Sequence, residues 1–130
     1  MLRVVLAGGR SLYKPSPIKM LRFFGDSLTE ARYLALWSKV NCRLMDELAH
    51  KPDVVDDIEQ GAEVVKAHCG EGKTFVVNSH LVSKQIWYSS PVSGPSRFDL
   101  HNEANNEWRD RNGRELFELL EKDLKTLADK

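Results

Sequence analysis

Residues 74–100 read TFVVNSHLVSKQIWYSSPVSGPSRFDL, and this stretch decides the fold. Apolar and polar residues alternate in it with a period of two, which is typical of strands that bury one face. The predicted strands are 63–68, 74–78, 84–89, 96–100 and a short one around Trp108. The turns between them are short, and short turns join antiparallel neighbours, so the strands are predicted to form an antiparallel meander.

A helix is predicted on each side of these strands. The first begins at a capping box, Ser27-Leu28-Thr29-Glu30, and Pro52 ends it. In both helices apolar residues recur at helical spacing, which is typical of one buried stripe. The stripe residues are Tyr33, Trp37, Val40, Leu44 and Leu48 in the first helix, and Leu116, Leu120, Leu124 and Leu127 in the second. The sequence therefore predicts an α+β fold, an α-β-α two-layer sandwich with two helices packed on one face of an antiparallel sheet.

The strand pattern also predicts which residues the helices leave uncovered. If both helices cover one face of the sheet, each strand turns its apolar residues toward them. The same parity in three strands then places Asn78, Gln85, Trp87 and Arg97 on the open face. Trp and Arg anchor many protein interfaces, and an indole in water leaves apolar area exposed. These four residues are therefore predicted to bind a partner; the alternative is that the 91–95 segment covers the indole.

Charge is unevenly distributed along the 130 residues. Residues 1–25 hold five basic residues and no acidic one, the composition of a mitochondrial transit peptide, with an approximate boundary. The alternative is a basic tail without a targeting role. Residues 26–130 are predicted to form one domain. This domain holds all 19 acidic residues but only the remaining 14 of the 19 basic ones. This excess of acid argues against a nucleic-acid partner, and no apolar run approaches the ~18 residues of a membrane span.

Six carboxylates crowd the end of the first helix and the loop and strand after it: Asp46, Glu47, Asp53, Asp56, Asp57 and Glu59. They repel one another unless a cation relieves them, and carboxylate oxygens are hard ligands that suit Fe, Mn, Ca or Mg ions. The spacing does not match an EF-hand and forces no closed shell, so a weak, water-exposed metal site is predicted. A solvated acidic rim is the alternative. His50 and His80 are further candidate ligands.

Residues 78–99, NSHLVSKQIWYSSPVSGPSRFD, carry the run QIW-x-SSP-x-SGP-x-R-aromatic-D and resemble the signature stretch of the frataxin family. The resemblance extends over about residues 27–128. It implies a role in iron–sulfur cluster assembly in the mitochondrial matrix, with weak binding of Fe²⁺ or Fe³⁺ at the acidic residues. It also implies docking on a cysteine desulfurase and its scaffold protein through Asn78, Gln85, Trp87 and Arg97. Ferrochelatase is a further partner that the resemblance implies.

The chain departs from the frataxin pattern at several acidic positions. Ala35, Lys39 and Arg43 stand in the middle of the first helix, where many frataxins are acidic, and His50 and His80 replace an acid and a glutamine. Three hypotheses follow from this thinner acidic set: an iron-binding regulator of cluster assembly, a ferroxidase that oxidises Fe²⁺ with O₂, and a metal-free adaptor. The regulator is the leading interpretation. Ferroxidase chemistry needs paired metals held by bridging carboxylates, and the spacing of the six carboxylates forces no closed shell of this kind.

Overall fold

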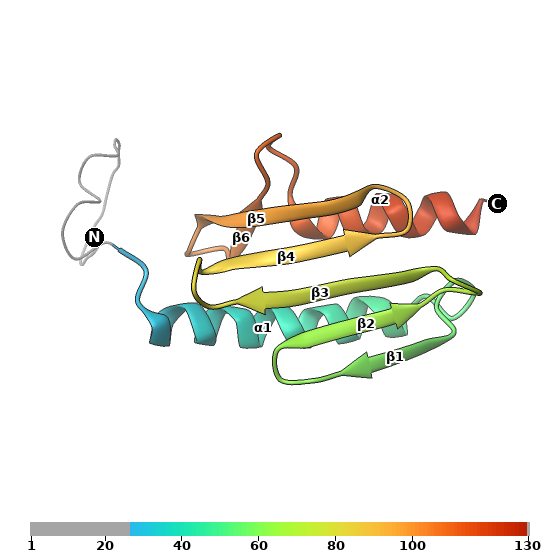
Figure 1. Cartoon of the computed structure of the whole chain (residues 1–130), viewed down its shortest axis with the longest axis horizontal. Coiled ribbons are helices and arrows are strands. Elements are labelled where there is room, and N and C mark those ends of the chain that lie inside the picture. Colours follow the sequence, from blue (N-terminus) through green and yellow to red (C-terminus); the bar gives the residue numbers. More distant parts are fainter. Residues whose placement is uncertain (1–26, 130) are drawn as a thin grey trace.

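The computed structural model of the chain describes residues 27–129, so the predicted transit peptide lies outside the described residues. The elements in chain order are α1 (Glu30–Ala49), β1 (Asp57–Gln60), β2 (Val64–His68), β3 (Thr74–His80), β4 (Gln85–Ser90), β5 (Gly94–Asn102), β6 (Glu107–Arg109) and α2 (Leu116–Ala128). The strands form one sheet in sequence order, and every neighbouring pair is antiparallel. Figure 1 shows α1 and α2 behind this sheet, so within the described residues no helix covers its front face. The predicted α+β sandwich is confirmed.

The hydrophobic core fills the space between the helices and the sheet. Both helices bury the stripes that their spacing predicts, except that Leu127 is only partly buried, and Trp37 is only 3% exposed. The sheet contributes its inward-facing side chains to this core, namely those of Val65, Ala67, Phe75, Val77, Ile86, Tyr88 and Phe98. Neither helix in residues 27–129 is long and apolar enough to cross a membrane.

The first helix begins two residues later than the predicted capping box. Its N-cap is Thr29 rather than Ser27, and the Thr29 hydroxyl accepts a hydrogen bond from the Arg32 N–H (3.2 Å). The Ser27 carbonyl accepts from Arg32 Nη1 (3.0 Å), and Arg32 also forms an ion pair with Glu103 in the turn after β5. Both hydroxyl residues suit an N-cap, and in the folded chain Thr29 takes that position.

The bounds of β2 to β5 differ from the predicted ones by at most two residues at either end, β6 contains Trp108, and β1 is a strand for which no bounds were predicted. The apolar alternation does not delimit β1, because Ile58 is its single apolar residue. Ile58 packs against the core, and the Gln60 amide on the same inward side donates to Asn41 Oδ1 of α1 (2.6 Å). Polar bonding to α1 therefore replaces most of the apolar signal in this edge strand.

A buried hydroxyl ties α1 to the sheet. The Tyr33 hydroxyl donates to the Gln85 carbonyl (2.6 Å) and accepts from the His80 N–H (2.9 Å). His80 and Gln85 are cross-strand partners at the facing ends of β3 and β4. The helix side chain thus bridges the last pair of this ladder before the turn.

A buried carboxylate ties α2 to the hairpin between β4 and β5. Asp123 is 2% exposed, and its Oδ2 accepts from the Tyr88 hydroxyl and from the Ser93 hydroxyl, each at 2.6 Å. Burial, together with the neighbouring carboxylate, raises the pKa of Tyr88 well above its ordinary value. Ser93 belongs to the 91–95 segment, the alternative cover for Trp87, and this bond anchors its side chain on the helical side of the sheet.

Candidate functional site

The four predicted partner-binding residues lie together on the uncovered face of the sheet. Asn78, Trp87 and Arg97 are cross-strand neighbours on β3, β4 and β5, and Gln85 lies two residues before Trp87. The apolar residues that alternate with them, Val77, Ile86, Tyr88 and Phe98, are buried; Ile86, for example, is 0% exposed. The predicted orientation of the four side chains is confirmed, whereas their role in binding stays a prediction.

Side chains from both adjoining strands cover part of the Trp87 indole. The His80 imidazole stacks on it, with 3.8 Å between ring centroids and 11° between ring planes. The Arg97 guanidinium carbon lies 4.5 Å from the indole centroid, a cation–π contact. The indole N–H donates to Gln85 Oε1 (3.0 Å). The ring is therefore held in one orientation by three neighbours.

Gln85 links this indole to the rest of the face. Its Oε1 also accepts from the Ser83 hydroxyl (3.0 Å), and its Nε2 donates to Asp99 Oδ1 (3.0 Å). The Ser83 hydroxyl in turn lies 2.7 Å from His80 Nδ1. His80, named above as a candidate metal ligand, thus has a packing role beside Trp87. Its even spacing from Asn78 on β3 is the sequence signal that places it on this face.

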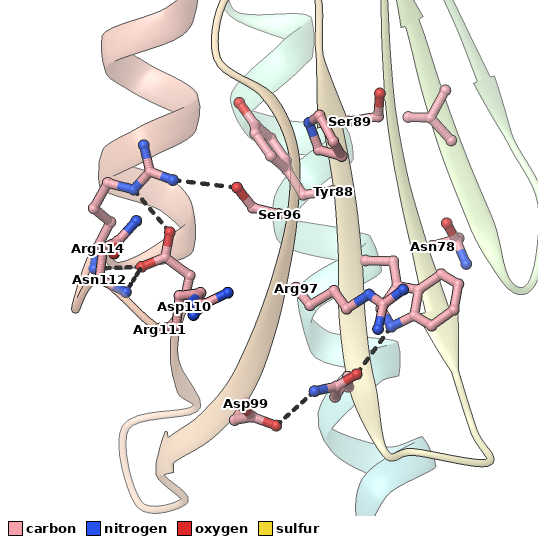
Figure 2. A pocket seen from close by; sticks show the side chains of 14 residues that line it. Asn78, Tyr88, Ser89, Ser96, Arg97, Asp99, Asp110, Arg111, Asn112 and Arg114 are labelled. Carbon is pink, nitrogen blue, oxygen red and sulfur yellow. Dashed lines mark hydrogen bonds and ion pairs between the residues drawn. The ribbon is translucent and has the colours of Figure 1, made fainter.

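A groove of about 660 Å³ runs over this face and reaches the loop between β6 and α2. Its lining contains all four predicted residues, with Val76, Pro95 and Asp99 from the strands and Asp110, Arg111, Asn112 and Arg114 from the loop. In Figure 2, the labelled loop residues lie on one side of β5, and Arg97 and Asn78 lie on the other. The loop residues are absent from the predicted site, because no periodic pattern indicates how a loop packs against a sheet.

Asp110 fixes the shape of that loop. It is 8% exposed; its Oδ1 accepts from the backbone N–H groups of Asn112 and Arg114, each at 2.9 Å, and its Oδ2 from Arg114 Nε (2.7 Å). Burial acts to raise the pKa of Asp110, but the hydrogen bonds and the charge of Arg114 outweigh it and lower that pKa below its ordinary value. Arg114 Nη2 also donates to Ser96 Oγ of β5 (3.2 Å), so the loop is tied to the sheet.

The six predicted metal ligands lie at the end of α1, in the loop after it and on β1, and all but Glu47 are exposed. Three of them already pair with a basic side chain or a histidine: Glu47 with Arg43 (3.4 Å), Asp46 with His50 (3.8 Å) and Glu59 with His68 (2.5 Å). Within residues 27–129, no three His, Cys, Asp or Glu side chains are grouped closely enough to hold a metal ion. These carboxylates therefore offer a cation open, hydrated contacts rather than a closed shell.

The two cysteines are free. Cys42 is exposed on α1, whereas Cys69 is buried directly after β2. Burial, and to a lesser extent the nearby Asp56 carboxylate, raises the pKa of Cys69. The thiol of Cys69 is therefore protonated at neutral pH and is a poor nucleophile.

Fold and site together define a class of protein: a small α+β domain that presents a groove, with an ordered tryptophan in its lining, on the helix-free face of its sheet. The family model of the frataxin-like domain matches residues 26–130. The chain belongs to the frataxin family.

Known relatives agree with this assignment. Mitochondrial frataxin of Arabidopsis thaliana is 45% identical over 72 residues, which cover 55% of this chain and 38% of that protein. The mitochondrial frataxin homolog of Saccharomyces cerevisiae is 36% identical over 88 residues, covering 66% of this chain and 49% of the homolog. The matched part is thus less than half the length of either relative. Trimeric yeast frataxin complexed with ferrous has a similar crystal structure, with a TM-score of 0.60, 29% identity, and coverage of 85% of this chain and 96% of that one.

Proposed function

We propose that this frataxin-family protein is an iron-binding regulator of mitochondrial iron–sulfur cluster assembly. It docks on a cysteine desulfurase–scaffold complex and promotes sulfur transfer there. The observation that carries the proposal is the gathering of Asn78, Gln85, Trp87 and Arg97 in one groove, on the face of the sheet opposite α1 and α2. An indole and a guanidinium that their neighbours already hold in place suit an interface anchor, because docking then costs little side-chain entropy.

Iron is the proposed cargo of the exposed carboxylates at the end of α1 and on β1. Hard oxygen ligands suit iron, and the yeast relative described above was crystallised with ferrous iron. Weak binding is expected, because the carboxylates are exposed and several have partners of their own. Asp57 and Glu59 alternate with the inward Ile58, so they face the same side of the sheet as Trp87. The iron-binding carboxylates and the docking residues would then contact the same partner.

The mitochondrial matrix is the proposed location, with residues 1–25 as the transit peptide and 26–130 as the working domain. The curated relatives from plant and yeast carry the word mitochondrial in their names. The basic, acid-free composition of residues 1–25 supports the same location.

A metal-free adaptor is the second candidate function. It is favoured by the lack, within residues 27–129, of any three acidic, histidine or cysteine side chains grouped to hold a metal ion. Fe²⁺ titration followed by NMR separates the two candidates. Shifts confined to the α1–β1 region support iron binding, whereas unchanged spectra leave only the adaptor.

The deciding experiment measures the rate of cluster synthesis by a purified desulfurase–scaffold complex, with and without this protein. Stimulation by the wild-type protein is expected, and Arg97→Ala should remove most of it. Leu34→Ala is the matched control, because Leu34 is 46% exposed on α1, on the other side of the molecule. An unchanged rate with the wild-type protein contradicts the proposed function, and equal effects of both variants contradict the assignment of the docking face.

A further inference from the structure

The charges that line the groove are not balanced within the protein. Asp110 and Arg114 neutralise each other at 2.7 Å, and Asp99 accepts from an amide rather than from a cation. Arg97 lies on the Trp87 ring and forms no ion pair within residues 27–129. Arg111 is exposed, and among the same described residues it has neither a hydrogen-bond nor an ion-pair partner. Two guanidinium groups are thus left facing one carboxylate.

The other residues that line the groove suit an extended peptide better than a small ion. Val76, Trp87 and Pro95 supply apolar surface, and Asn78 and Asn112 supply amides. The groove has a volume of about 660 Å³, within the ~300–1,000 Å³ that ligand sites occupy. A groove of this size is too small to enclose a folded domain. Net positive charge disfavours a metal cation here. A short extended peptide with an acidic side chain matches both the shape and the charge.

We propose that the groove receives an extended acidic segment of the docking partner and that Arg111 recognises a carboxylate of that segment. This inference rests on the proposed function, because it concerns the partner that docks through the same face. Arg111 is well placed for the task, since the loop that carries it is held against β5 by Asp110 and Arg114. A guanidinium can bind a carboxylate through two parallel hydrogen bonds, which gives direction as well as charge. Arg111 would thus act as a specificity residue at the far wall of a site whose anchor is Trp87.

The test compares the affinity of the desulfurase–scaffold complex for the full wild-type chain, Arg111→Glu and Lys122→Glu, at low and at physiological ionic strength. Lys122 is exposed on α2, on the opposite side of the sheet, so its reversal changes net charge equally without touching the groove. Arg111→Glu is expected to weaken binding by about 10-fold or more at low ionic strength, because like charges then meet at the interface. Lys122→Glu should bind like the wild type. Salt should weaken the wild-type complex more than the Arg111→Glu complex.

Two results would overturn the inference, and they are distinguishable. If Arg111→Glu and Lys122→Glu bind with equal affinity while the wild type binds tightly, the groove does not recognise an acidic segment, and the proposed function stands. If the wild type does not bind the complex, the proposed function fails and the inference falls with it. Circular dichroism should show the same folded spectrum for all three proteins, since within residues 27–129 neither the Arg111 nor the Lys122 side chain has a hydrogen bond or an ion pair to lose.

Discussion

Truncation of the two tryptophans to alanine should separate folding from docking. Trp37 is 3% exposed, and its indole N–H donates to the Ala62 carbonyl at 2.8 Å. Removing a buried indole of this kind costs ~3–5 kcal/mol of unfolding free energy. Trp87 loses a stacking contact with His80, worth ~0.5–1.5 kcal/mol, and a partly exposed cation–π contact with Arg97, worth ~0.5–1 kcal/mol. Trp87→Ala should therefore cost about 1–2.5 kcal/mol.

Urea denaturation of the two variants measures this difference. With a denaturant slope of ~1–3 kcal/mol per M for a small protein, Trp87→Ala should lower the midpoint by about 1 M, and Trp37→Ala by two to three times as much. The functional order should be reversed. Loss of an interface anchor costs ~2 kcal/mol or more of binding, which is about 30-fold in affinity for the desulfurase–scaffold complex.

Stability and affinity must both be measured, because either alone permits another explanation. If Trp87→Ala lowers the midpoint as far as Trp37→Ala does, the indole belongs to the core and the open-face interface is wrong. If Trp87→Ala is stable and still binds the complex fully, the face is exposed but is not the docking surface.

Three further perturbations test the charged and buried groups. Asp56→Ala combined with Asp57→Ala should weaken Fe²⁺-induced NMR shifts and leave the unfolding free energy unchanged or slightly raised, since like-charge repulsion falls; unchanged shifts would move the site elsewhere. The pKa of Tyr88 lies above the ordinary tyrosine value of ~10, so the unfolded tyrosine ionises first and stability should fall above pH ~10, by up to about 1.4 kcal/mol per pH unit. Tyr88→Phe should flatten that fall in alkaline urea titrations, and an unchanged slope would contradict the assignment. Asp110 has a folded pKa below 3.8, so its stabilisation is present above that pH and is lost as the pH falls through the folded value. Asp110→Asn should be less stable at neutral pH and lose less in acid, which thermal midpoints at several pH values would show.

The strand parity was predictable because the helices cover a single face of the sheet. The buried residues of β3, β4 and β5 all have the same parity, so the inward direction of Phe75 fixes the outward direction of Asn78 and its neighbours. The same physics explains why the orientation of Trp87 could be predicted without knowing its contacts. The turn before β6 suits its sequence, since Asn106 has a positive φ of 51°, a conformation that asparagine tolerates.

Other features depend on contacts between distant residues, which carry no local signal. The Asn106 amide donates to the Leu36 carbonyl of α1, 70 residues away, and nothing in the turn sequence indicates that bond. The loop wall of the groove depends in the same way on Arg114, which donates to Ser96 of β5, 18 residues away. The iron ligands could be predicted only as a group of carboxylates, because exposed side chains are not fixed by packing.

The hydroxyl that Tyr33 inserts between His80 and Gln85 has a consequence for local opening of the sheet. Local opening of a hairpin at its turn ordinarily involves only the turn and the two strands that it joins. Here the pair of strand residues nearest the turn is bridged through a helix side chain, so separating the pair also requires α1 to release its hydroxyl. The opening free energy at this end is thereby coupled to helix packing on the far side of the sheet. The turn end of the β3–β4 hairpin, which carries Trp87, should therefore open only when α1 separates from the sheet. Native-state hydrogen exchange would find the two opening as one unit.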